Sequence, residues 1–106
     1  MALLQIVPAD VTGILRLIGE LDISTVEATQ ARLEEGLRGR KSLSLDTSEL
    51  AFIDSQGIRM LIILGEQALA QGSTVSVLNC SKPVRRALEV AVPHGIPGVE
   101  ISQVER

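Results

Sequence analysis

The chain has 106 residues, of which 45% are hydrophobic and only 1% are aromatic, and its formal net charge is −3. This length predicts a single small domain over residues 1–106 with an aliphatic core. Because aromatic stacking groups are scarce and the net charge is negative, we do not expect the protein to bind nucleic acid directly.

The cysteine count and the start of the chain bear on where the protein works. Cys80 is the only cysteine, so neither an intramolecular disulfide nor a cysteine metal cluster can form within the chain. The first residues lack the basic and apolar regions of a secretion signal, and no apolar run approaches the roughly 18 residues that span a bilayer. We expect a cytoplasmic protein without membrane insertion.

The first part of the chain predicts two strands and then an amphipathic helix. Apolar residues run through residues 3–7 and, after a turn, through residues 11–18. A capping box follows, with Ser24 as the expected N-cap and Glu27 reaching back to it. We expect this helix to end near Gly39.

The second part predicts an α/β fold. Apolar and polar residues alternate around residues 43–46 and 74–77, which is typical of strands buried on one face. The helical pattern between them predicts a right-handed parallel crossover. A further helix from Ser81 to about Ala91 and a short strand at 99–101 complete a mixed, mostly parallel sheet with its helices packed on one face.

The stretch Asp54-Ser55-Gln56-Gly57 stands directly before the central helical pattern. In one interpretation Asp54 or Ser55 is an ordinary N-cap and Gly57 eases a close turn. In the other, Ser55 is an exposed hydroxyl at a helix N-terminus, where backbone N–H groups tolerate a phosphate, so that it acts as a phosphorylation switch.

The helix after this stretch is apolar on two sides. Its predicted core stripe consists of Ile58, Leu61, Ile62, Gly65, Ala68 and Leu69. The opposite side carries Met60, Ile63 and Leu64 beside Arg59. An ordinary surface helix does not explain these residues, so either a second layer or a partner protein should cover them.

The sequence does not favour an enzyme. Asp54, Ser55 and His94 are the residue types of a hydrolytic triad, but no Gly-x-Ser-x-Gly elbow is present. The paired acids that would hold magnesium at the end of the first strand are missing, and so is a phosphate-binding P-loop. We therefore expect no catalytic residues, no metal and no cofactor.

Three landmarks in the sequence are similar to those of a known family. They are Leu45-Asp46 with residues 52–58, the stretch Gly19-Glu20-Leu21-Asp22-Ile23-Ser24-Thr25, and more weakly residues 84–89. In this order they resemble STAS domains, and in particular bacterial anti-sigma-factor antagonists. The resemblance covers about residues 3–101.

The resemblance implies a function and a set of site residues. An antagonist binds an anti-sigma factor that is also a serine kinase and so frees the sigma factor; phosphorylation at the position of Ser55 dissolves the complex, and a serine phosphatase restores it. Asp22 and Asp54 would then flank the acceptor. Gln56 stands where relatives often carry a second hydroxyl, which leaves Ser55 as the only hydroxyl in the motif.

A partner surface and two alternatives complete these expectations. The partner is expected to contact Arg59, Met60, Ile63 and Leu64. The family also includes STAS subunits of membrane machines, such as lipid-transport ABC complexes, and stressosome-type scaffolds. Because one fold hosts several roles, the sequence leaves these alternatives open.

Overall fold

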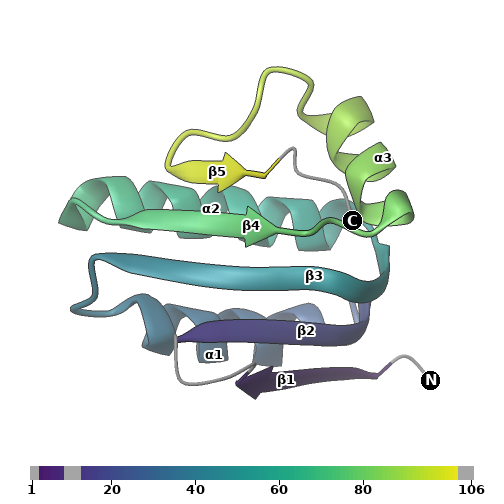
Figure 1. The fold of residues 1–106 in the computed structure, drawn as a ribbon, viewed down its shortest axis with the longest axis horizontal. Helices are drawn as coiled ribbons and strands as arrows, with labels where there is room; N and C mark the ends of the chain where they lie inside the picture. The colour runs from purple at the N-terminus through teal and green to yellow at the C-terminus, as the bar shows by residue number, and fades with distance from the viewer. Residues whose placement is uncertain (1–2, 9–12, 103–106) are drawn as a thin grey trace.

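The computed structural model describes residues 3–8 and 13–102, and these form a five-stranded sheet with three helices (Figure 1). In chain order the elements are β1 (Leu4–Pro8), β2 (Ile14–Leu21), α1 (Val26–Leu37), β3 (Ser42–Ile53), α2 (Ser55–Gln71), β4 (Thr74–Leu78), α3 (Lys82–Ala91) and β5 (Val99–Ile101).

The strands lie in the sheet in the order in which they occur in the chain. β1 pairs with β2 in antiparallel orientation, and every later pair, β2 with β3, β3 with β4 and β4 with β5, is parallel. β3 is therefore the central strand. The predicted α/β fold with a mixed, mostly parallel sheet is confirmed.

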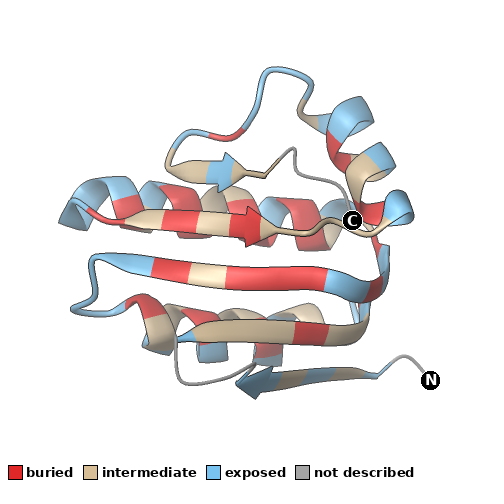
Figure 2. Cartoon of the chain, viewed as in Figure 1, coloured by how far each residue is buried: buried red, intermediate tan, exposed pale blue. Residues whose placement is uncertain are grey.

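The helices and the alternating strands enclose an aliphatic core. In Figure 1, α1 and α2 lie behind the sheet, and α3 stands beyond the carboxyl end of β4. The buried residues lie mainly on β3, on alternate positions of β4 and on the inner sides of the helices (Figure 2). The largest fully buried side chains are Leu17, Leu21, Leu33, Leu37, Leu45, Leu50, Met60, Leu64, Val75, Val77 and Val84.

The structure corrects the expected end of the third strand. The alternating pattern predicted a strand only around residues 43–46, but β3 continues through the polar residues that follow to Ile53. The strand carries extra residues at two points, where its register with β2 shifts. Ser48 N–H donates to the Asp46 carboxylate at 2.9 Å. These β-bulges explain why the alternating pattern breaks although the strand does not.

The start of α1 also differs from the prediction. The N-cap residue is Thr25 and makes no side-chain capping bond, so the predicted capping box of Ser24 and Glu27 is wrong. The Ser24 hydroxyl instead donates to the Asp22 carboxylate at 2.6 Å.

The second strand, predicted over residues 11–18, continues to Leu21, and residues 11–12 lie outside the described part of the chain. The elements after β4 follow the predictions. Ser81 caps α3, its hydroxyl accepting from Val84 N–H at 3.4 Å, and Val99–Ile101 forms a short strand. In the described part of the chain, no helix is both long enough and apolar enough to cross a membrane.

Candidate functional site

The candidate acceptor Ser55 is the first residue of α2, directly after the carboxyl end of β3. Asp54 is the N-cap: its Oδ1 accepts from Gln56 N–H at 2.9 Å and from Gly57 N–H at 3.1 Å. The Ser55 side chain is exposed, and its hydroxyl makes no hydrogen bond within residues 3–8 and 13–102. Because the neighbouring aspartate does the capping, the serine hydroxyl is left for other chemistry.

A second loop lies beside this motif at the same edge of the sheet. Leu21 and Ile53 are paired at the ends of β2 and β3, and Asp54 N–H donates to the Leu21 carbonyl at 3.1 Å. Asp22 and Asp54 therefore follow neighbouring strand ends. The structure brings together the two loops that carry the sequence-predicted acids.

Asp22 is held by its own loop. Its Oδ1 accepts from the Ser24 hydroxyl at 2.6 Å and from Ser24 N–H at 2.9 Å, and these bonds lower the pKa of the Asp22 carboxyl. Thr25 Oγ1 donates to the Glu20 carbonyl at 2.8 Å and accepts from Asp22 N–H at 3.0 Å. Asp22 is consequently a fixed negative charge beside the Ser55 motif at neutral pH.

Gly57 is required by packing. It is buried, and a Cβ atom added to it would lie 2.7 Å from Ile53 Cγ1 and 2.9 Å from Leu21 Cγ. The missing side chain therefore lets the first turn of α2 approach the ends of β2 and β3. Gly57 sets the position of Ser55 relative to both loops.

Replacing Gly57 with alanine should destabilise the protein by about 1–3 kcal/mol, because the new methyl group overpacks the contact with Leu21 and Ile53. Denaturant unfolding monitored by circular dichroism measures this. Gly36→Ala is the matched control, since Gly36 also lies in a helix and its added Cβ would be 3.4 Å from Leu43 Cδ1. Equal stabilities of the two variants would contradict the packing role.

The structure corrects the expected partner surface on α2. Met60 and Leu64 are both 0% exposed and belong to the core, so the prediction that they form a surface for a partner is wrong. Arg59 is exposed and Ile63 is partly buried. Leu69, which was assigned to the core stripe, is instead 57% exposed.

The reason is that α2 is covered on more than one side. Gln67 Nε2 of α2 donates to Glu34 Oε2 of α1 at 2.8 Å, which shows that α1 packs alongside. A Cβ added to Gly65 would collide with the Pro97 carbonyl oxygen in the segment before β5. Of the two explanations for the second apolar side, a second layer of the same chain is the correct one for Met60 and Leu64.

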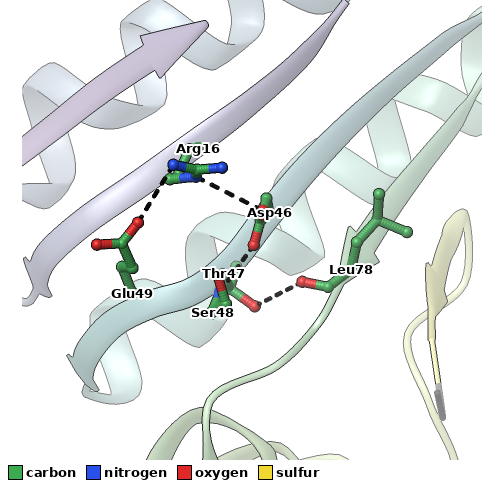
Figure 3. Close-up of polar contacts among 6 residues, drawn as sticks. All are labelled: Arg16, Asp46, Thr47, Ser48, Glu49 and Leu78. Atoms are coloured by element: carbon green, nitrogen blue, oxygen red, sulfur yellow. Dashed lines mark hydrogen bonds and ion pairs between the residues drawn. The ribbon is translucent and has the colours of Figure 1, made fainter. Parts of the chain in front are cut away.

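The Leu45-Asp46 landmark has a structural setting of its own. Arg16 on β2 lies with its Nε 3.6 Å from Asp46 Oδ2 and its Nη1 3.4 Å from Glu49 Oε2 (Figure 3). Next to them, Thr47 Oγ1 donates to the Leu78 carbonyl at 3.2 Å and links β3 to β4. Asp46 thus stabilises the bulged part of β3.

The residues considered above for a hydrolytic triad or a metal site do not form such a site within residues 3–8 and 13–102. The Asp54 carboxylate is bonded to backbone N–H groups of α2, while His94 is exposed in the segment between α3 and β5. In the part of the chain that the structure describes, no three His, Cys, Asp or Glu side chains are grouped so that they could hold a metal ion.

Sequence reasoning missed two exposed apolar side chains near the motif. Ile23 lies in the loop after β2 and is 76% exposed, and Phe52 lies near the end of β3 and is 47% exposed. A useful sequence signal for Phe52 was that it is the only aromatic residue of the chain.

Comparisons with known proteins agree with this fold. A sequence-family model described as "Mlab, STAS domain" matches residues 4–96. No curated protein sequence matches the chain.

Solved structures of anti-sigma factor antagonists share the fold. The unphosphorylated form of the antagonist SpoIIAA is 22% identical, with a TM-score of 0.72 over 95% of this chain and 89% of that one. An antagonist from Mycobacterium paratuberculosis is 17% identical, with a TM-score of 0.73 over 97% and 88% of the two chains. The phosphorylated form of Bacillus SpoIIAA is 18% identical, with a TM-score of 0.64 over 95% and 92%.

Proposed function

Because this chain belongs to the STAS domain family, we propose that it acts as an anti-sigma-factor antagonist whose binding is switched off by phosphorylation of Ser55. The observation that carries the proposal is the exposed Ser55 hydroxyl at the start of α2, next to an aspartate that already caps the helix. The structural neighbours, which are anti-sigma factor antagonists, support the same role.

The proposed partners follow from this role. Unphosphorylated, the chain binds an anti-sigma factor that is also a serine kinase and thereby releases the sigma factor. The kinase transfers the γ-phosphoryl group of ATP to Ser55 Oγ, ADP leaves, and the hydroxyl proton is lost; a serine phosphatase reverses the modification by hydrolysis. The chain is the substrate of both enzymes and has no catalytic residue.

The surroundings of Ser55 imply that the added charge destabilises the complex with the partner but not the fold. A phosphoserine brings about −1.5 to −2 charge units at neutral pH, and a helix N-terminus tolerates an anion. Asp54 is adjacent, and Asp22 follows the neighbouring strand. A partner docked over this edge would have to remove water from a phosphate that stands beside two carboxylates.

Other hydroxyl groups near the site are already engaged. The Ser81 hydroxyl donates to the Leu50 carbonyl at 2.6 Å, Thr25 Oγ1 donates to the Glu20 carbonyl, and the Ser24 hydroxyl donates to Asp22. Ser55 has no such partner within the described residues. The proposal therefore singles out one acceptor among several nearby hydroxyl groups.

Phosphorylation should occur on Ser55 when the folded chain is incubated with ATP and the kinase that co-purifies with it from native cells. Mass spectrometry of the digested protein locates the phosphate. Ser55→Ala should abolish the modification, whereas Ser48→Ala, which removes another exposed serine hydroxyl, should leave it unchanged. Phosphate on Ser48, Ser81 or Thr25 with Ser55 unmodified would refute the assignment.

The same co-purification separates the proposed function from its alternatives. A histidine-kinase-like ATPase bound to the chain supports the antagonist. An ABC ATPase would support a STAS subunit of a membrane lipid-transport machine, and large assemblies of STAS proteins would support a stressosome-type scaffold.

A further inference from the structure

An apolar groove lies between the end of β3 and the first turns of α3. The groove has a volume of about 410 Å³, and its lining residues are Phe52, Ile53, Lys82, Pro83, Arg86 and Ala87. Phe52 is the only aromatic side chain of the protein and is nearly half exposed. We call this the Phe52 groove.

Two cations border the Phe52 groove. Lys82 and Arg86 lie one helical turn apart on α3, both are exposed, and neither forms an ion pair within residues 3–8 and 13–102. Glu20, paired with Phe52 across the β2–β3 register, is the acid directly opposite in the sheet. The positive charges of the groove thus come from α3, while Glu20 lies on the side of the sheet.

We propose that the Phe52 groove docks an acidic segment of a partner protein, which places an apolar side chain against Phe52 and carboxylates against Lys82 and Arg86. Aromatic and arginine side chains are the residue types that most often dominate binding energy at interfaces. Charge complementarity selects an acidic segment over a basic one. Identifying this partner as the anti-sigma factor rests on the proposed function.

The position of the groove explains why phosphorylation of Ser55 would weaken binding. Ile53 lines the groove, and Ser55 follows two residues later at the start of α2. A phosphate on Ser55 would add negative charge two residues along the chain from Ile53, and in the proposed complex the groove holds carboxylates of the partner. The phosphate repels an acidic segment, so phosphorylation weakens binding without any change in the fold.

Selection from a library of random short displayed peptides tests the groove without knowledge of the partner. Unphosphorylated wild-type protein is the bait, and peptides that bind the empty support are removed beforehand. The enriched peptides should combine Asp or Glu with a large apolar residue. Their affinity for Phe52→Ser should be lower by roughly tenfold or more, while Leu69→Ser, which removes another exposed apolar side chain, should bind normally.

Charge reversal provides the second arm. Lys82→Glu/Arg86→Glu should lose affinity for the selected peptides, again by roughly tenfold, and should instead enrich basic peptides. Lys41→Glu/Arg32→Glu changes the net charge equally at residues that do not line the groove and should leave binding unchanged. Folding of all four variants is checked by circular dichroism.

Two results would overturn the proposal: enrichment of basic or purely apolar peptides on the wild-type protein, or equal binding by the groove variants and their controls. Neither result bears on phosphorylation, since no kinase is present. Conversely, an unmodified Ser55 in the kinase experiment would refute the proposed function without affecting the conclusion from the peptide selection.

Discussion

Replacing Leu64 with alanine should lower the free energy of unfolding by about 2–5 kcal/mol, because the side chain is fully buried and its removal leaves a cavity. Leu64 lies in α2 and belongs to the same core cluster as Leu45 and Val77. Chemical denaturation of the purified variant measures the effect. The same substitution should not alter partner binding at temperatures where the variant remains folded.

Ile63→Ala is the matched control, since Ile63 is the neighbouring residue on α2 and is only partly buried. Its cost should be nearer to about 1 kcal/mol, in proportion to the smaller apolar area that it removes from water. If Leu64→Ala were as stable as Ile63→Ala, the arrangement of α2 against the sheet would have to be revised.

On the proposed function, phosphorylation of Ser55 should weaken binding to the anti-sigma factor by at least about 2 kcal/mol, or roughly thirtyfold in Kd. Ser55→Asp should weaken it less, because aspartate carries less charge and fewer acceptor oxygens than phosphate. The stability of the free protein should change by no more than about 1 kcal/mol, since an anion at a helix N-terminus is tolerated. Calorimetric binding and thermal melting of the same samples measure both quantities.

Ser48→Asp is the control for this experiment, because it adds the same charge as Ser55→Asp at a different exposed serine, on β3, and should leave binding unchanged. Equal affinity of wild-type and phosphorylated protein would reject the switch. A large loss of stability on phosphorylation would instead show that the modification acts by unfolding the start of α2.

The fold was predictable where one physical rule governs a segment. Alternation at Leu43 and Leu45, and again at Val75 and Val77, identified strands buried on one face, and all four residues are buried as expected. The bulges of β3 could not be foreseen, because they insert residues into the alternating pattern and make a strand resemble a turn.

The sequence predicted where the Ser55 motif lies relative to the strands. It did not predict which side chains of α2 are exposed. The motif at the start of α2 lies at the carboxyl end of β3, as the crossover pattern implied. Helical periodicity could not assign Met60 and Leu64 correctly, since it does not reveal how many neighbours surround a helix. Here α1 and the segment before β5 both pack against α2.

The capping bond of Asp54 determines what kind of substrate a kinase would meet. Ser55 is bounded by a side chain that bonds two N–H groups of α2 and by a backbone bond from Asp54 to Leu21 on the neighbouring strand. The hydroxyl is reachable, but the backbone around it is not free to become an extended segment. On the proposed function, the kinase must therefore recognise Ser55 within a rigid folded surface. A short peptide with the same sequence would lack the features that the kinase recognises.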